Sequence, residues 1–457
     1  MPEAAPTSNA RRSRRLIGLL AAAVLTAASA GACADRGTPP ADAAYGTHIP
    51  TGTPQGLRAK QTMDMLNSDW PIGEPSVSTL AAPEHVAEVT ESMETLWWDR
   101  PITLTAVDIG AGTATLRVRN SYGAEQDIEL RVDDESLVDQ FEVTLRPPTI
   151  ENWADIDTEL TESGARYSYQ VSRVLPAPGG RRCEPIAGAN TDLSLPLASI
   201  FKLYVLLAVA EAVRAGTLDW DDRLTVTERA KAVGSAALDH LPPGAQISVR
   251  EAAQQMISAS DNMTTDLLIG RLGTDAVERA LVAAGHHDPA SMTPFPTMHE
   301  LFSVGWGEPD LREQWQHASP QDRAELLRQV SSRPYRPDPQ RTHTPASNYG
   351  AEWFGTAKDI CRVHIALQEA AVGPAAPVRD ILSAIPGVSV DRSTWTYIAA
   401  KGGNLPGDLT FSWYAVDHTG QPWVVSFQLN WPQYRSKTAA GWLLSIVHQA
   451  FELIPVG

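Results

Sequence analysis

The spacing of apolar residues changes near residue 100, and this change limits the folds that the first part of the chain can adopt. Val86, Val89 and Met93 recur at helical spacing, which predicts an amphipathic helix. From residue 102 to 145, apolar and polar residues alternate in four short runs separated by turns, a pattern typical of an antiparallel meander. Helices followed by such a meander predict a small α+β domain over residues 55–148.

The rest of the chain is long enough for a second domain. The protein has 457 residues, and ordinary domains hold roughly 100–200 residues. Pro147 and Pro148 end the first unit, and we place the second domain at residues 160–457. Within it, residues 303–354 are rich in Pro, Arg, Gln and Ser, which predicts an insertion loop.

The N-terminus has the layout of an export signal. Arginines at four of the positions 11–15 precede an apolar run and then Cys33, which predicts a signal peptide over residues 1–33. The run Ala30-Gly31-Ala32-Cys33 resembles a bacterial lipobox, so we expect a lipid on Cys33 and a membrane anchor. Ordinary cleavage, with Cys33 lost or unmodified, is the alternative. Residues 34–54 are predicted to be a flexible tether.

Charge and cysteine content narrow the location and the partners. The net charge is −17, and no cluster of Lys and Arg follows the first fifteen residues, which argues against nucleic-acid binding. A small-molecule or peptidoglycan-derived substrate is expected instead, for a protein outside the cytoplasm at the cell membrane or secreted. Cys183 and Cys361 either form a disulfide there or remain two buried thiols.

Ser199 and Lys202 form the first motif that can support chemistry. They stand three residues apart, after Pro196 and at the start of a long apolar helix, so their side chains lie over the same helix face. A serine hydroxyl becomes a nucleophile when a neighbouring base removes its proton, and a desolvated lysine can be that base.

Two further motifs follow in the sequence. Ser260-Asp261-Asn262 precedes a second helical run, where Ser260 and Asp261 also suit a helix cap. Lys401-Gly402-Gly403 lies in an alternating run followed by two more strands, which places it on a strand of a sheet. A lysine in a surface turn is the simpler alternative for this last motif.

The three motifs in this order resemble those of class A β-lactamases and penicillin-binding proteins. The resemblance covers residues 160–457 and implies a β-lactamase-like α/β domain, with an antiparallel sheet flanked by helices and an all-helical subdomain. The two-domain arrangement resembles lipoproteins and clavulanate-cluster proteins that join an isomerase-like or cystatin-like module to a β-lactamase-like domain.

The resemblance implies a role for each motif residue. Ser199 would be the acylated nucleophile and Lys202 its general base, while Ser260 would relay a proton. Asn262 would orient the substrate, and Lys401 would interact with Ser260 and with a substrate carboxylate.

The strand that carries Lys401 would also supply part of the substrate-binding edge. Gly402, Gly403 and Asn404 would line this edge, and the backbone N–H groups of Ser199 and Asn404 would form the oxyanion hole.

The sequence departs from the class A pattern at two positions. Gly402 offers no hydroxyl where the family has Thr or Ser, which puts β-lactam affinity in doubt. Pro296 stands where the family's deacylating glutamate would lie. Glu300 and Glu308 lack the expected flanking residues, and Glu352 is a remote substitute.

The sequence therefore predicts an exported serine hydrolase that acts on a β-lactam, amide or ester through an acyl-serine intermediate. A penicillin-binding D,D-peptidase or esterase with slow deacylation is the alternative within enzymes, and a non-catalytic binding lipoprotein is the alternative outside them. No cofactor and no metal is expected, because His286, His287 and His299 lack ligand spacing and are interpreted as solvated loop histidines.

Overall fold

The computed structural model describes residues 46–235 and 237–456. The predicted signal peptide and Cys33 lie outside the described residues, so lipidation and export stay predictions. Within the described ranges, no helix is long and apolar enough to cross a membrane.

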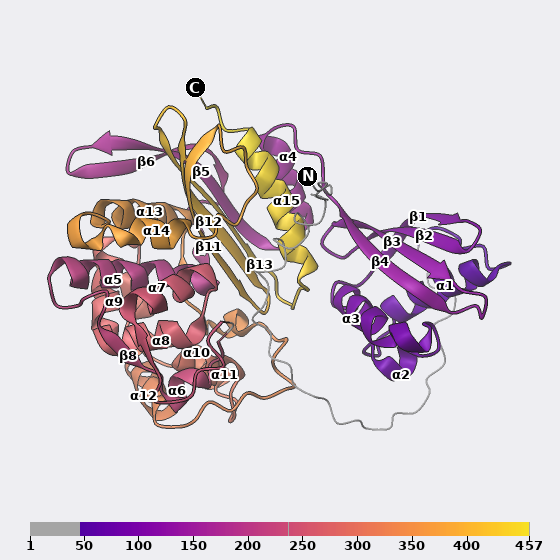
Figure 1. Ribbon diagram of the computed structural model, residues 1–457, viewed down its shortest axis with the longest axis horizontal. Coiled ribbons are helices and arrows are strands. Elements are labelled where there is room, and N and C mark those ends of the chain that lie inside the picture. Colours follow the sequence, from indigo (N-terminus) through magenta and orange to yellow (C-terminus); the bar gives the residue numbers. More distant parts are fainter. Residues whose placement is uncertain (1–45, 236, 457) are drawn as a thin grey trace, which may run out of the picture.

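The first domain packs three helices on a four-stranded sheet (Figure 1). The sheet is an antiparallel meander in the order β1-β2-β3-β4. Alternate residues of each strand face the helices, and Met63, Met93 and Leu116 lie in the resulting core. The elements are α1 (Pro54–Leu66), α2 (Glu74–Val77), α3 (Val86–Trp97), β1 (Thr103–Ile109), β2 (Thr113–Arg119), β3 (Glu125–Val132) and β4 (Val138–Arg146).

The second domain is built on a five-stranded antiparallel sheet with the order β11-β12-β13-β5-β6. Its strands are β5 (Arg166–Ala177), β6 (Gly180–Ala189), β11 (Trp395–Leu405), β12 (Asp408–Asp417) and β13 (Pro422–Asn430). The beginning of the domain thus pairs with its end through β5 and β13. The strand with the third motif, β11, lies at an edge of the sheet, where one side of its backbone is open to a ligand.

Helices cover both faces of this sheet (Figure 1). On one face, α4 (Trp153–Glu162) and α15 (Thr438–Glu452) pack over an aromatic core that includes Trp413 and Trp423. On the other face, α5 (Lys202–Arg214), α13 (Ala357–Ala370) and α14 (Pro377–Ser383) join a helical layer. Further helices of that layer include α6 (Glu228–Lys231), α7 (Val249–Ser258), α8 (Asn262–Leu272), α9 (Thr274–Ala283) and α10 (Met298–Trp306).

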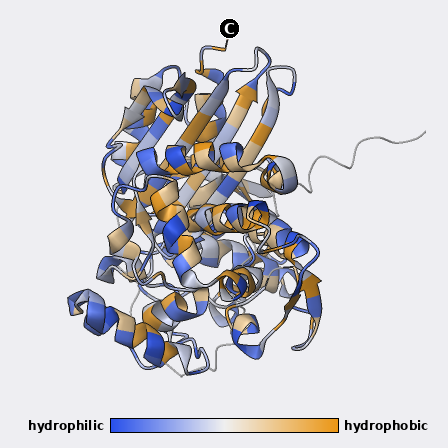
Figure 2. Cartoon of the chain, turned by 90° about the vertical axis from the view of Figure 1, so that its left-hand side faces the viewer, coloured by the Kyte–Doolittle hydropathy of each residue, from blue (hydrophilic) through white to orange (hydrophobic). Residues whose placement is uncertain are grey.

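Helix α5 is the centre of the helical layer. Its residues from Lys202 to Ala210 are all buried, as expected of a helix that is apolar on every side. Figure 2 shows orange residues along the large sheet and mixed colouring on the helices in front of it. The predicted fold class, a small α+β domain followed by a β-lactamase-like α/β domain, is confirmed.

The stretch 303–354 is not a plain loop, contrary to the sequence-based expectation. It contains α11 (Arg312–His317), α12 (Pro320–Ser331) and the short strand β10 (Phe354–Gly355), which pairs with β7 (Leu195–Pro196). Leu326, Leu327 and Val330 bury the inner face of α12. Pro320 stands at the first turn, where proline is compatible with a helix, so its presence did not indicate a loop.

A disulfide within the second domain and contacts between the two domains join distant parts of the chain. A disulfide joins Cys183 of β6 to Cys361 of α13, which settles the alternative left open by the sequence. Between the domains, the buried Asp99 carboxylate accepts hydrogen bonds from the backbone N and the hydroxyl of Ser436, at 2.9 and 2.5 Å. Trp98 of the first domain also stacks on His343, with ring centroids 4.5 Å apart.

Candidate active site

Ser199 lies in a tight turn that packs on the edge of the large sheet. The turn, Ala198–Phe201, is 3₁₀-helical and leads directly into α5, and it contacts β11 and β12. Ala198 has a φ of 43°, a left-handed conformation that costs energy for a residue with a Cβ. The turn is held by Leu197, whose carbonyl accepts from Thr410 at 2.8 Å.

Lys202 is the hydrogen-bonding centre of the site. Its side chain is fully buried, and its Nζ donates to the Ser260 carbonyl at 2.5 Å and to Asn262 Oδ1 at 2.8 Å. The Ser260 hydroxyl is also within reach, at 3.3 Å from Nζ. The first two motifs therefore meet through Lys202.

The loop before α8 aims Ser260 and Asn262 at Lys202. Asp261 is the N-cap of α8 and accepts from the Thr264 backbone N at 2.8 Å. Ser260 has a φ of 55°, and Asp261 also accepts from Ser235. The capping role expected for Asp261 and the placement of its neighbours in the site are thus compatible.

Lys401 reaches the same point from the sheet. Its Nζ donates to Ser260 Oγ at 2.9 Å and to the Gly402 carbonyl at 2.5 Å. Lys202, Ser260, Asn262 and Lys401 therefore form one connected group beside the Ser199 turn. Within residues 46–235 and 237–456, the structure places no hydrogen-bond partner at the Ser199 hydroxyl, which leaves it available to a substrate.

Burial controls the protonation of both lysines. It lowers the pKa of Lys202 to about 7, against the opposing charges of Asp261 and Asp266. The pKa of Lys401 is lowered well below its ordinary value, first by burial and then by the nearby Lys202 charge. A lysine with a pKa of about 7 is roughly half neutral at pH 7, and the neutral form can accept a proton from a serine hydroxyl.

The two glycines after Lys401 meet different neighbours. A Cβ on Gly403 would lie 2.5 Å from the Ser199 backbone N, so glycine is required for β11 to approach the turn. A Cβ on Gly402 would lie 2.9 Å from the Phe411 ring. Asn404, the next residue, is exposed on β11 near its end. The close approach at Gly403 places β11 beside the backbone of Ser199, as the predicted oxyanion hole would require.

The structure holds the carboxylates of Glu300 and Glu352 in different ways. Glu300 completes the capping box of α10 with Thr297 and accepts from Ser331. Glu352 is buried, and burial together with Asp408 raises its pKa well above the ordinary value. The expectation that neither is an evident deacylating base therefore remains.

Asp266 is a site residue that the sequence analysis missed. Its carboxylate accepts from the backbone N of Met298 at 2.7 Å and of His299 at 2.9 Å, and burial raises its pKa to about 6. It thus anchors the start of α10, and its charge acts on Lys202. The available signal was an acid four residues after Asn262 within an apolar helical run.

The interpretation of the histidines as solvated loop residues is wrong for His286 and His299. Both are buried, with 6% and 0% of their surface exposed. His286, His287 and Asp359 bring ligand-type atoms within 4.8 Å of one another. Both ring nitrogens of His286 already have partners, Phe354 O and the Asp288 N–H, so hydrogen bonding accounts for this group.

Comparison with known families gives two matches along the chain. Residues 160–341 match the model of the Beta-lactamase enzyme family. Residues 49–138 match a model described as ORF 12 gene product N-terminal. The resemblance of the first domain to an isomerase-like or cystatin-like module stays a hypothesis.

Individual known proteins are also similar to part of this chain. Beta-lactamase VEB-1 from Pseudomonas aeruginosa is 25% identical over 126 residues, which are 26% of this chain and 42% of that protein. The chain thus spans less than half the length of this curated relative.

Two solved structures are similar over most of their own length. The β-lactamase from Sphaerobacter thermophilus is 21% identical and covers 66% of this chain and 98% of its own, with a TM-score of 0.45. The chromosome-encoded β-lactamase of Vibrio parahaemolyticus is 16% identical and covers 65% and 96%, with a TM-score of 0.45.

Proposed function

We propose that the protein is an exported serine hydrolase whose second domain belongs to the β-lactamase and penicillin-binding-protein-like superfamily, which is supported by the family match over residues 160–341. It forms an acyl-enzyme at Ser199 with a β-lactam, amide or ester and releases the acyl group slowly. The observation that carries the proposal is the continuous chain of hydrogen bonds from Lys202 through Ser260 to Lys401 beside the Ser199 turn.

The proposed acylation step assigns a role to each of these groups. Neutral Lys202 removes the proton of Ser199 Oγ while that oxygen attacks the substrate carbonyl carbon. The backbone N–H groups of Ser199 and Asn404 stabilise the oxyanion. When the tetrahedral intermediate collapses, the bond to the leaving group breaks, and Ser260 Oγ gives its proton to the leaving group. Lys202 then returns the proton it accepted to Ser260.

Deacylation needs a base that activates water, and this half of the reaction is expected to be slow. Glu300 is held in a capping box. Burial raises the pKa of Glu352 well above its ordinary value, which disfavours the ionised form that would act as the base. An acyl group on Ser199 therefore persists, as in penicillin-binding D,D-peptidases, or is released mainly from reactive esters.

Export is proposed from the arginine-rich and apolar N-terminal segment, with lipidation of Cys33 as its anchor. The Cys183–Cys361 disulfide supports this placement, because structural disulfides persist mainly in oxidising compartments. Growth with labelled palmitate, comparing wild type with Cys33→Ala, tests the anchor. Label in both variants, or in neither, would contradict it.

The test of the hydrolase proposal is the intact mass of the purified protein after incubation with a fluorescent penicillin and, separately, with a fluorophosphonate. We expect a stoichiometric adduct in wild type and in the control Ser194→Ala, and none in Ser199→Ala. Adduct half-life then gives the deacylation rate.

The outcomes separate the alternatives. An adduct that persists for hours supports slow deacylation, whereas rapid turnover of the penicillin would contradict it and indicate a resistance-type β-lactamase. If neither probe labels Ser199, the hydrolase proposal fails and a non-catalytic binding lipoprotein becomes the better description.

A further inference from the structure

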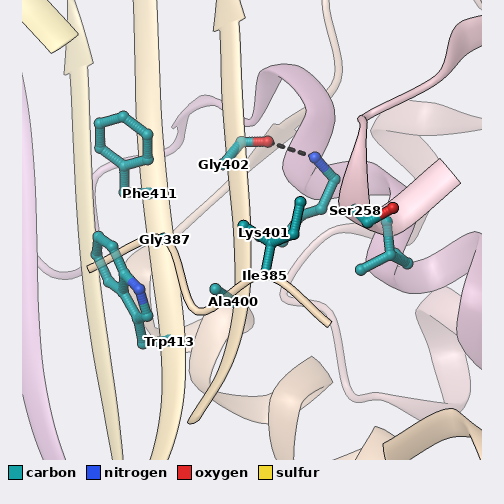
Figure 3. A pocket seen from close by; sticks show the side chains of 9 residues that line it. Ser258, Ile385, Gly387, Ala400, Lys401, Gly402, Phe411 and Trp413 are labelled. Atoms are coloured by element: carbon teal, nitrogen blue, oxygen red, sulfur yellow. Dashed lines mark hydrogen bonds between the residues drawn. The ribbon is translucent and has the colours of Figure 1, made fainter. Parts of the chain in front are cut away.

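A narrow hollow opens beside the strand that carries Lys401 (Figure 3). Its lining is mostly apolar and includes Ile257 from α7, Ile385 from the segment after α14, and Phe411 and Trp413 from β12. Lys401 and Gly402 of β11 complete the side that leads to the site. The hollow is therefore continuous with the group formed by Lys202, Ser260 and Lys401.

The Phe411 ring takes the space that a side chain at position 402 would need. These residues are direct partners in the register of β11 and β12. A Cβ at position 402 would lie 2.9 Å from Phe411 Cδ1 and 3.0 Å from Cε1. A hydroxyl-bearing residue there, and with it a donor for a substrate carboxylate, is excluded while Phe411 keeps its position.

Lys401 is a poor anchor for an anion in the hollow. Its Nζ is committed to Ser260 Oγ and to the Gly402 carbonyl, and only 3% of its surface is exposed. Burial and the Lys202 charge also lower its pKa. Among the described residues that line the hollow, no other cationic side chain is present.

The hollow borders Lys401, which holds the proton donor of the proposed reaction. Ser260 Oγ gives its proton to the leaving group in the proposed reaction, and Lys401 holds this hydroxyl at 2.9 Å. Lys401 and Ser258, two residues before Ser260, both line the hollow. A substituent that extends from the leaving group past Lys401 would reach this hollow beside Phe411.

We infer that this hollow is a specificity site for an uncharged apolar substituent on the leaving group, and that the enzyme selects against leaving groups with a carboxylate. The inference rests on the proposed function of Ser199. Burying a carboxylate without a paired cation is costly, whereas apolar surface gains free energy by leaving water. The accessible volume of about 10 Å³ suits only a terminal group near the size of one water molecule, such as the methyl of a methyl ester.

A matched pair of esters tests the inference on the wild-type full chain. The two probes are 3-(butyryloxy)benzoate and its methyl ester, which share the acyl group and differ in the charge of the leaving group. Each kcat/KM is divided by the rate constant for hydroxide-catalysed hydrolysis, which removes the difference in intrinsic reactivity. We expect the methyl ester to be preferred by about tenfold or more. Equal corrected values, or a preference for the carboxylate, would overturn the inference.

A substitution at Phe411 tests the same point from the protein side. Phe411→Arg introduces a cation beside Gly402 and is expected to shift the ratio by about tenfold toward the carboxylate, while Phe411→Leu keeps the preference for the methyl ester. An unchanged ratio in a folded Phe411→Arg variant contradicts the inference, and if this variant does not fold, the wild-type ratio decides.

Failure of the inference and failure of the proposed function are distinguishable. Hydrolysis of both esters that is lost in Ser199→Ala, without discrimination between them, overturns the specificity site and leaves the hydrolase standing. If neither ester is hydrolysed and the fluorophosphonate does not label Ser199, the proposed function fails and the inference fails with it.

Discussion

The two sides of the Ser199 site differ in how their ionisable groups are arranged. On the first side, which we call the acylation side, Lys202 and Lys401 are buried within hydrogen-bonding distance of Ser260. On the second side, formed by residues 296–353, the carboxylates of Glu300 and Glu352 are committed to a helix cap and to a buried position beside Asp408. Burial lowers the pKa of both lysines and so favours their neutral, basic form, whereas it raises the pKa of Glu352 and disfavours the ionised form that could act as a base.

This contrast shows that one physical effect, desolvation, has opposite chemical consequences for the two residue types. A buried lysine gains the ability to accept a proton near pH 7, and a buried glutamate loses it. The acylation side is thus equipped for the first half of a hydrolytic reaction, and the second side lacks an evident base for the other half.

The largest effect is expected from Lys202→Ala. Removal of the general base should lower the rate of Ser199 acylation at pH 7 by about 10³-fold. Stopped-flow or intact-mass kinetics with the fluorophosphonate would measure the rate. Lys358→Ala is the control, because Lys358 pairs with Asp192 on the surface. Acylation of Lys202→Ala at the wild-type rate would contradict the role of Lys202 as general base, and with it the contrast between the two sides.

The pH dependence of acylation should follow Lys202. Because the neutral amine is the active form and its pKa is about 7, the rate should rise with pH through 7 and level off above 8. The increase from pH 5 to pH 8 is expected to be about 10²-fold. A profile that is flat between pH 5 and pH 9 would show that another group limits the reaction.

The two glycines of β11 should differ in their response to alanine. Gly403→Ala places a Cβ against the Ser199 backbone N and should lower acylation by about tenfold to a hundredfold through distortion of the oxyanion hole. Gly402→Ala meets a side-chain ring that can shift, so its loss should be about threefold. The same kinetic assay compares the two variants, and equal losses would contradict the assignment of the oxyanion hole.

The smallest effect concerns the second side. The pKa of Asp408 is raised to about 8, chiefly by burial, and that of Glu352 is also raised. The folded state therefore binds more protons than the unfolded state between about pH 4 and pH 8, and stability should fall as pH rises through this range.

Glu352→Gln tests this arrangement. The variant should melt about 3 °C above wild type at pH 9, where the acids repel each other, and within about 1 °C of it at pH 5. Differential scanning calorimetry at both pH values measures the difference. The half-life of the acyl-enzyme should stay unchanged, and a large increase in half-life would instead identify Glu352 as the missing base.

Much of the fold could be predicted from the sequence because the signals are local. The change in apolar spacing near residue 100 predicted helices and then a meander, and both are present. The helices in 303–354 were missed because prolines and arginines between them dominate the composition. The burial of His286 and His299 was also missed, since neither residue type nor spacing indicates which loops are covered.

The sequence by itself determined that Ser199 and Lys202 share one helix face, because three residues along a helix make nearly one turn. Its alternating pattern also favoured a strand for Lys401 and its glycines, and β11 is that strand. The tertiary structure alone decided that Lys401 meets Ser260 across 141 residues, that Phe411 fills the space beside Gly402, and that Glu352 is buried near Asp408. These contacts depend on strand register and on the packing of distant segments, which no local spacing encodes.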